Sequence, residues 1–209
     1  MKPDWAEENL QTIRTLMERS ALYRRALAPI MLFAGGLGVA AAAIGIVFDF
    51  DSLIGFTSLW TVTAVMAIAG AFLIARRQAL GDKENFWSPP TRRVGQALLP
   101  PLFAGMLVGF TLTFELDEKY PIVLTGFWLL FYGCALHSAG FFMSRGIRLF
   151  GWILVISGCI LLCFLAHFAY HPWTINAINA NWLMGFFFGV LHLAYGAYLY
   201  LTERKNPVA

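Results

Sequence analysis

Charge within its long apolar stretches is what this sequence most clearly lacks. Charged residues make up 13% of the 209 residues and hydrophobic residues 59%, whereas ordinary soluble domains carry about 25% charged residues. So few charges cannot cover the surface of a folded domain in water. The sequence also lacks a Gly-rich phosphate loop and a continuous basic stripe that could follow phosphates. We therefore expect no nucleic acid among its partners.

Cysteine is also scarce, with only three residues in the chain. Cys134, Cys159 and Cys163 all lie within apolar stretches. This placement excludes an extracellular disulfide framework. The simplest interpretation is that they are small apolar packing residues.

Six apolar stretches of about 20 to 23 residues predict an integral membrane bundle of the all-α class. Each is long enough to cross a hydrocarbon core of about 30 Å at about 1.5 Å of rise per residue. Helices are expected because backbone groups in lipid must find their hydrogen-bond partners within the segment. The expected spans, within a transmembrane domain over 26–201 that is followed by a cytoplasmic tail over 202–209, are 26–48, 53–75, 94–114, 121–143, 147–168 and 182–201.

The basic residues fall on one side of this alternation. They occupy the N-terminal segment, the second and fourth joints and the C-terminus, while the opposite joints carry only Lys119 among several acids. Basic residues concentrate in cytoplasmic loops, so both termini are expected in the cytoplasm.

Residues 1–25 predict an amphipathic cytoplasmic helix. Asp4 followed by Glu7 is typical of a helix N-terminus. Leu10, Ile13 and Met17 recur at helical spacing, with Arg14, Arg24 and Arg25 among the charges on the other faces. One interpretation places this helix in the inner membrane interface, beside anionic headgroups. The other makes it a docking site for a soluble cytoplasmic protein.

Glycines at a spacing of four predict close helix packing. Gly105 with Gly109, and Gly185 with Gly189, place small residues on one helix face. They are expected to hold the bundle together, or alternatively to form a homo-oligomer.

Two short motifs also recur at an offset of 70 residues, which suggests three hairpin repeats: Phe33-Ala34-Gly35 with Phe103-Ala104-Gly105, and Ala69-Gly70 with Ala139-Gly140.

Histidines are the ionisable residues found inside the spans, since no Asp, Glu, Lys or Arg lies well within any of them. This absence argues against a carboxylate-based ion pump. His137 and His192 lie at comparable depth, and the main expectation is neutral side chains that hydrogen-bond across the bundle. The competing hypothesis makes them ligands of one b-type haem. A two-haem arrangement is disfavoured because the second and third spans have no histidine.

A second candidate set lies in and just after the fifth span, where Cys159, Cys163, His167 and His171 recur every fourth residue. Thiolate and imidazole suit Cu(I) or Zn(II). However, each step of four residues advances about 40° around the helix. A metal site would therefore need further ligands from another span.

Several segments resemble small six-span bacterial inner-membrane proteins with no established activity. They are Pro100-Pro101-Leu102-Phe103-Ala104-Gly105, the stretch from Trp128 through Trp152, and Leu191-His192-Leu193-Ala194-Tyr195-Gly196. The resemblance covers most of the chain and consists of packing residues. It implies a bacterial plasma membrane and no catalytic residue. The triple hairpin is also similar to six-helix acid-resistance membrane proteins, from which no residue role is transferred.

These observations favour a non-enzymatic membrane protein that is an accessory, sensory or hydrophobic-ligand-binding subunit. It would act through its bundle and its N-terminal helix, with a homo-oligomer, a membrane complex or a cytoplasmic protein as partner. The alternative is a haem- or metal-binding redox protein that uses His137 and His192. A third possibility is a channel or permease for a neutral solute, for which the spans offer only scattered Ser, Thr and Asn.

Overall fold

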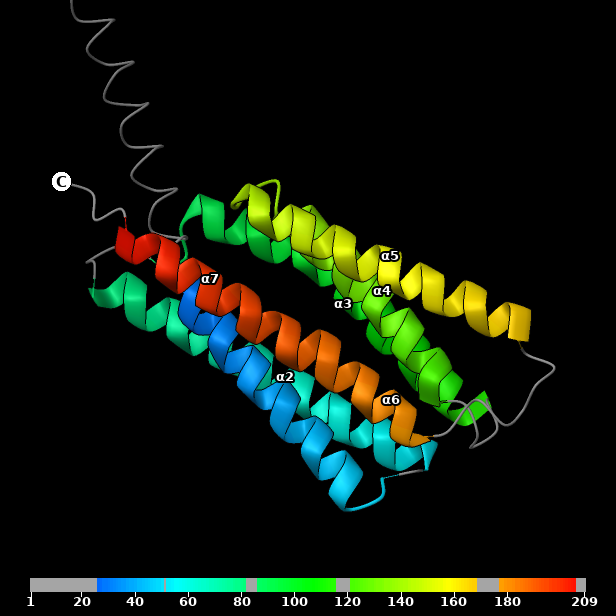
Figure 1. Cartoon of the computed structure of the whole chain (residues 1–209). Helices are drawn as coiled ribbons and strands as arrows, with labels where there is room; N and C mark the ends of the chain where they lie inside the picture. The colour runs from blue at the N-terminus through cyan, green and yellow to red at the C-terminus, as the bar shows by residue number, and fades with distance from the viewer. Residues whose placement is uncertain (1–25, 51, 82–85, 116–120, 169–176, 206–209) are drawn as a thin grey trace, which may run out of the picture.

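The protein is a bundle of long helices, and no strand occurs in the part of the chain that the structure describes. The computed structural model describes residues 26–50, 52–81, 86–115, 121–168 and 177–205 (Figure 1). In chain order the helices are the first span (Ala26–Val47), α2 (Leu53–Gly81), α3 (Pro89–Glu115), α4 (Pro121–Ala139), α5 (Arg145–Phe168), and a last span made of α6 (Ala177–Met184), the π-helix η2 (Gly185–Val190) and α7 (Leu191–Lys205).

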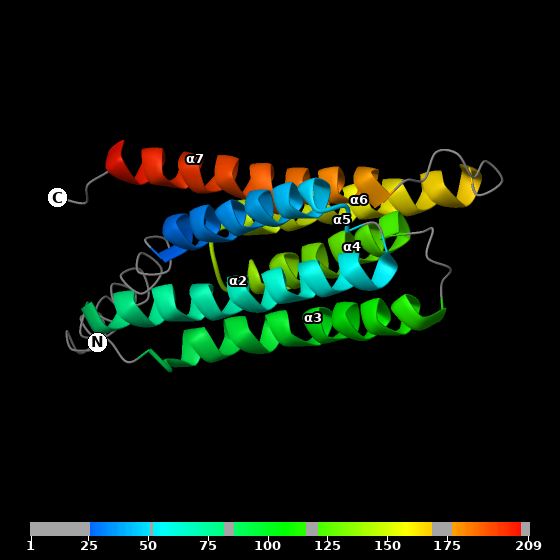
Figure 2. The ribbon, with the colours of Figure 1, turned by 90° about the horizontal axis from the view of Figure 1, so that it is seen from below.

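Six of these helical segments are long and apolar enough to cross a membrane. The all-helical, six-span architecture expected from the sequence is therefore confirmed, and the fold is that of a multi-pass membrane protein. The helices run up and down alternately, and α2 lies beside α3 along one side of the bundle (Figure 2). We call one end the arginine end because it holds the inner joints with Arg76, Arg77, Arg92, Arg93, Arg145 and Arg148. The opposite end is the loop end.

Several helix boundaries differ from the expected ones. At the arginine end, α2 continues to Gly81 rather than 75, and α3 begins at Pro89 rather than 94. Both additions extend the helices beyond the apolar stretches into the segments that carry Arg76, Arg77, Arg92 and Arg93. In contrast, α4 ends at Ala139 and not at 143. The chain turns at Gly140, which packs closely against the backbone of Arg148 on α5. The N-terminal helix expected over 1–25 lies outside the described residues, and the hairpin repeats stay a prediction.

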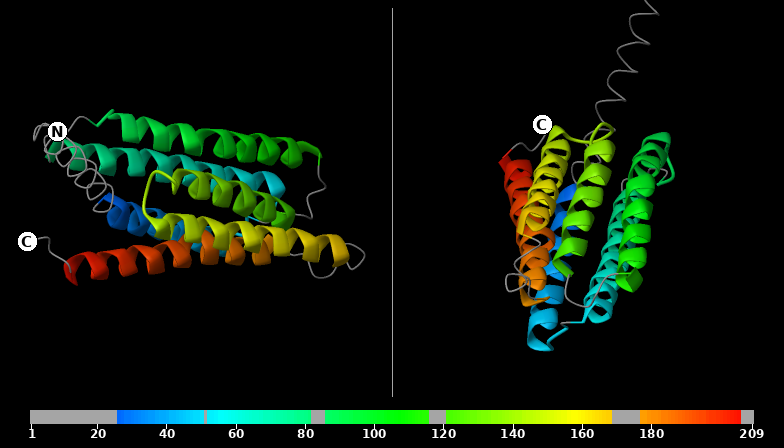
Figure 3. Two further views of the ribbon diagram at one scale, coloured as in Figure 1. Left: turned by 90° about the horizontal axis from the view of Figure 1, so that it is seen from above. Right: turned by 90° about the vertical axis from the view of Figure 1, so that its right-hand side faces the viewer.

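Glycines hold α4 and α5 close together. Gly126 and Gly133 on α4 and Gly140 just beyond its end are seven residues apart, as are Gly151 and Gly158 on α5. A Cβ atom built on Gly133 would lie 2.7 Å from the backbone N of Val155 and 2.8 Å from the carbonyl O of Gly151. A spacing of seven keeps small residues along one seam of a helix pair. The two backbones therefore meet directly over most of their length, as the paired ribbons show (Figure 3).

The first and last spans form a second glycine-lined pair. Gly35 faces the backbone N of Leu193 and the carbonyl O of Gly189, and a Cβ atom there would lie 2.7 and 2.9 Å from them. Gly38 faces the carbonyl of Phe188, so the first span lies against the π-helix. Such close backbone packing is a usual way in which helices associate in lipid. Lipid tails are as apolar as the side chains, so no hydrophobic force drives the helices together.

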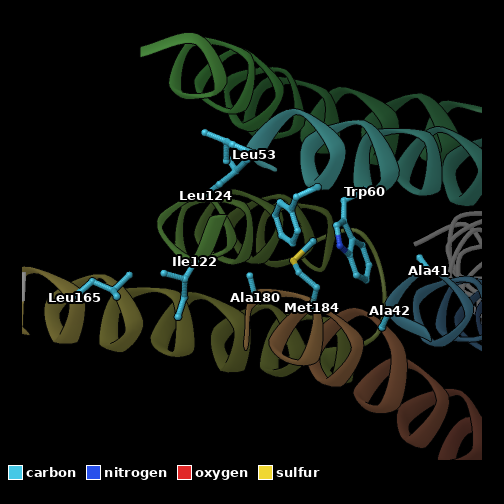
Figure 4. Packing of buried hydrophobic residues seen from close by; sticks show 10 residues of the cluster. Ala41, Ala42, Leu53, Trp60, Ile122, Leu124, Leu165, Ala180 and Met184 are labelled. Atoms are coloured by element: carbon cyan, nitrogen blue, oxygen red, sulfur yellow. The ribbon is translucent and has the colours of Figure 1, made fainter. Parts of the chain in front are cut away.

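Aromatic side chains attach α2 and α3 to these two pairs. Trp128 on α4 stacks on Phe56 of α2 with ring centroids 6.0 Å apart, and its Nε1 donates a hydrogen bond to the carbonyl O of Gly105 on α3. Trp60 of α2 lies over Met184 and Ala42, in a core to which the first span, α2, α4, α5 and α6 contribute (Figure 4). The remaining α2 and α3 surface is mostly exposed and apolar, as expected for helices that face lipid.

The α4–α5 seam predicts the effect of a single methyl group. Gly133→Ala is expected to lower the free energy of unfolding by about 1 to 3 kcal/mol, because the added Cβ would force the two backbones apart. The matched control is Gly36→Ala, since a Cβ on Gly36 meets nothing within 4 Å. That variant is expected to be neutral or slightly stabilising. Thermal unfolding of the two variants in the same detergent tests this prediction. Equal melting temperatures would contradict the close packing of α4 against α5 at Gly133.

Candidate functional site

The most unusual site in the bundle surrounds His192, the second residue of α7. Its side chain is 1% exposed, and both of its ring nitrogens have hydrogen-bond partners. Nδ1 lies 2.9 Å from the carbonyl O of Phe187, and Nε2 lies 2.9 Å from the hydroxyl of Tyr132 on α4. The contact therefore joins the last span to the α4–α5 pair.

These two partners determine where the proton of His192 lies. A carbonyl oxygen can only accept a hydrogen bond, so Nδ1 must carry the hydrogen. Nε2 of the neutral ring is then an acceptor, and the Tyr132 hydroxyl donates to it. His192 is thus a neutral imidazole in the Nδ1–H form. The Tyr132 hydroxyl would have to stop donating to Nε2 before that nitrogen could bind a metal or take up a proton.

The π-helix provides one of the two partners. The backbone N–H of Leu191 bonds to the carbonyl O of Phe186, five residues earlier. The carbonyl of Phe187, which would receive that N–H in an α-helix, instead accepts the hydrogen from His192 Nδ1. Short π-helical turns of this kind occur frequently at functional sites. The sequence predicted one continuous helix over 182–201, and no residue pattern there signals the wider turn.

Aromatic rings enclose the imidazole on several sides. Phe150 of α5 meets it edge-on, with ring centroids 4.8 Å apart and planes at 88°. Phe188 lies nearly parallel to it at 6.1 Å, and Tyr195 in turn stacks on Phe150 with ring centroids 5.2 Å apart. Such apolar walls exclude water and strengthen the two hydrogen bonds.

A second buried polar contact lies toward the loop end. Asn181 of α6 is fully buried, and its Oδ1 accepts a 2.9 Å hydrogen bond from Nε1 of Trp60. Its amide group lies directly against Gly45 of the first span. Within the described residues its Nδ2 has no hydrogen-bond partner. This contact ties α2 to the last span.

The structure does not bring His137 to His192. His137 lies in the last turn of α4, between Phe141 and Trp152 with ring centroids 5.3 and 5.1 Å from its own. His192 is paired with Tyr132 instead. Ligation of haem by His137 and His192 would require Tyr132 to release Nε2, and the haem hypothesis stays a prediction.

The metal-ligand set predicted around the fifth span is not assembled by the described residues. Cys159, Cys163 and His167 are exposed along α5, and His171 lies outside the described residues. No group of three or more His, Cys, Asp or Glu side chains in the described ranges could hold a metal ion. The Cu(I) or Zn(II) hypothesis also stays a prediction.

The four glycines predicted for helix packing lie at contacts between helices. A Cβ atom on Gly105 would lie 3.0 Å from Phe131 Cβ, and one on Gly109 would lie 2.6 Å from the indole Nε1 of Trp128. Gly185 and Gly189 face Ala42 and Val39 of the first span. Sequence reasoning missed the seven-residue glycine series of α4 and α5, which was visible in the sequence. It also missed Tyr132, which no local pattern marks as a histidine partner.

Comparison with protein-family models, with curated proteins and with solved structures finds no match for this chain.

Removing the Tyr132 hydroxyl tests the His192 site. Tyr132→Phe is expected to lower the free energy of unfolding by about 1 to 3 kcal/mol, because it leaves a buried Nε2 without a donor. Tyr198→Phe is the matched control, since it also removes one phenol hydroxyl but Tyr198, on α7 with His192, is 61% exposed. If both variants unfold at the same temperature in detergent, the Tyr132–His192 bond contributes nothing to stability.

Proposed function

We propose that this protein is a non-enzymatic multi-pass protein of the bacterial plasma membrane that acts as an accessory, sensory or hydrophobic-ligand-binding subunit. The observation that carries the proposal is the use of His192. One ring nitrogen joins the last span to α4 through Tyr132, and the other bonds to the Phe187 carbonyl within the last span itself. A histidine employed in this way cross-links the bundle and is not available as a general base.

The charge distribution supports an orientation with both termini in the cytoplasm. The described joints of the arginine end carry six arginines, and α7 ends there with Glu203, Arg204 and Lys205. The charged residues that the structure describes at the loop end are Asp49 and Glu115. Basic residues beside spans favour the cytoplasmic face, where anionic lipids give the membrane a negative surface. The resemblance to small bacterial inner-membrane proteins supports the choice of membrane.

The route from the N-terminal segment to the His192 site supports a sensory or accessory role. Residues 1–25 continue directly into the first span, which lies against η2 through Gly35 and Gly38. Packed helices can make small sliding movements along one another. A partner bound to the N-terminal helix would therefore displace the first span against the turn that supplies the Phe187 carbonyl.

The test is whether assembly depends on the apolar face of the N-terminal helix. We expect native mass spectrometry of the full chain to show a defined oligomer or complex larger than the 23.3 kDa monomer. Substituting Leu10, Ile13 and Met17 with Asn should leave mainly monomer, because it removes the apolar stripe. The matched control replaces residues of the polar faces: Glu8→Gln, Thr15→Asn and Glu18→Gln.

Two results would overturn this proposal. A monomeric wild-type protein, or an assembly unchanged in the Leu10, Ile13 and Met17 variant, would remove the role of the N-terminal helix. A Soret absorption band in the purified protein that is lost in His137→Ala or His192→Ala would replace the proposal with the haem alternative. We expect the purified protein to be colourless.

A further inference from the structure

A separate cluster lies on the surface of the α4–α5 pair at the arginine end. It consists of His137 in the last turn of α4, Phe141 just beyond it, and Arg148 and Trp152 in the first two turns of α5. Both aromatic rings are largely exposed, Phe141 at 64% and Trp152 at 49%. The cluster therefore faces the surroundings of the bundle and not its interior.

Arg148 is held in place without an acidic partner. Its Cζ lies 5.2 Å from the centroid of the Phe141 ring, a cation–π contact that leaves the guanidinium N–H groups free to donate. In the described part of the chain Arg148 makes no ion pair. An arginine offers five donors in a planar fork that matches the oxygens of a phosphate group.

Gly140 explains why Arg148 takes this position. A Cβ atom on Gly140 would collide with Arg148 Cγ and would lie 2.8 Å from its backbone N. The missing side chain lets the aliphatic part of Arg148 cross the end of α4 and place its guanidinium over Phe141. The position of the charge is thus fixed by the helix packing.

His137 supplies a second donor beside the arginine. Its Nδ1 is enclosed and has no hydrogen-bond partner among the described residues. A buried N–H without an acceptor is rarer than a buried acceptor without a donor, so the favoured neutral form has its hydrogen on Nε2. Nε2 is then the donor of this ring, which Phe141 and Trp152 flank.

We propose that His137 and Arg148 form a binding site for the phosphate group of an anionic phospholipid. Both residues lie at the end of a membrane-spanning helix, which is the depth of the lipid headgroups. The exposed rings of Phe141 and Trp152, with Leu149 beside them at 65% exposure, offer an apolar surface to the acyl chains. This surface favours a lipid over free phosphate, and the site does not depend on the function proposed above.

The experiment measures lipid binding by the full-length protein in detergent, using native mass spectrometry with phosphatidylglycerol and phosphatidylcholine as probes. Arg148→Gln is expected to weaken phosphatidylglycerol binding about fivefold, the effect of one arginine near an anionic surface. The matched control is Arg145→Gln, which removes the same charge from an exposed arginine without a ring contact. That control is expected to change binding less than twofold.

Two further variants separate position from charge. His137→Phe keeps an aromatic ring and removes the donor, and Gly140→Ala keeps every charge and displaces Arg148. Both are expected to weaken phosphatidylglycerol binding, with the melting temperature recorded to identify any variant that fails to fold. Equal losses in Arg148→Gln and Arg145→Gln would overturn the proposal, as would equal binding of the two lipids. Displacement of the lipid by millimolar inorganic phosphate would assign the site to free phosphate instead.

Discussion

A polar group buried in a membrane-spanning bundle is costly unless it finds hydrogen-bond partners within the protein, and His192 finds one for each of its ring nitrogens. The side chain carries two nitrogens into the interior, and each unsatisfied group there would cost several kcal/mol on the order of the transfer scales. Tyr132 and the Phe187 carbonyl satisfy both nitrogens at 2.9 Å. Because Tyr132 is on α4 and His192 is on the last span, their hydrogen bond also links the two glycine-packed helix pairs.

The glycine seams and the π-turn serve this link. Gly35 and Gly38 let the first span approach the backbone of η2, so a wider helical turn can be accommodated without a gap. This wider turn leaves the Phe187 carbonyl free to accept the hydrogen bond from His192 Nδ1. A helix of regular α geometry would pair that carbonyl with the Leu191 amide, and His192 Nδ1 would then need another acceptor in an apolar environment of Phe150 and Phe188.

The sequence was sufficient to predict the six spans because their length and apolarity are local properties. It was less informative about helix ends, such as the end of α4 at Ala139, because that end depends on Gly140 meeting α5. The pairing of His192 with Tyr132 could not be predicted, since it depends on two helices that are 60 residues apart in the sequence. The main expectation for His137 and His192 was a neutral histidine that hydrogen-bonds across the bundle. His192 has that geometry, whereas His137 lies at the surface beside Trp152.

The protonation state of His192 is the most direct test of this account. Solid-state NMR of ¹⁵N-histidine-labelled protein in lipid, with His192→Gln used to assign the signals, reports which ring nitrogen carries hydrogen. The account predicts a neutral ring at pH 7 with hydrogen on Nδ1 and none on Nε2, unchanged when the sample is exposed to haem. A ring with hydrogen on Nε2, a doubly protonated ring, or an Nε2 signal shifted by an iron bond would contradict it.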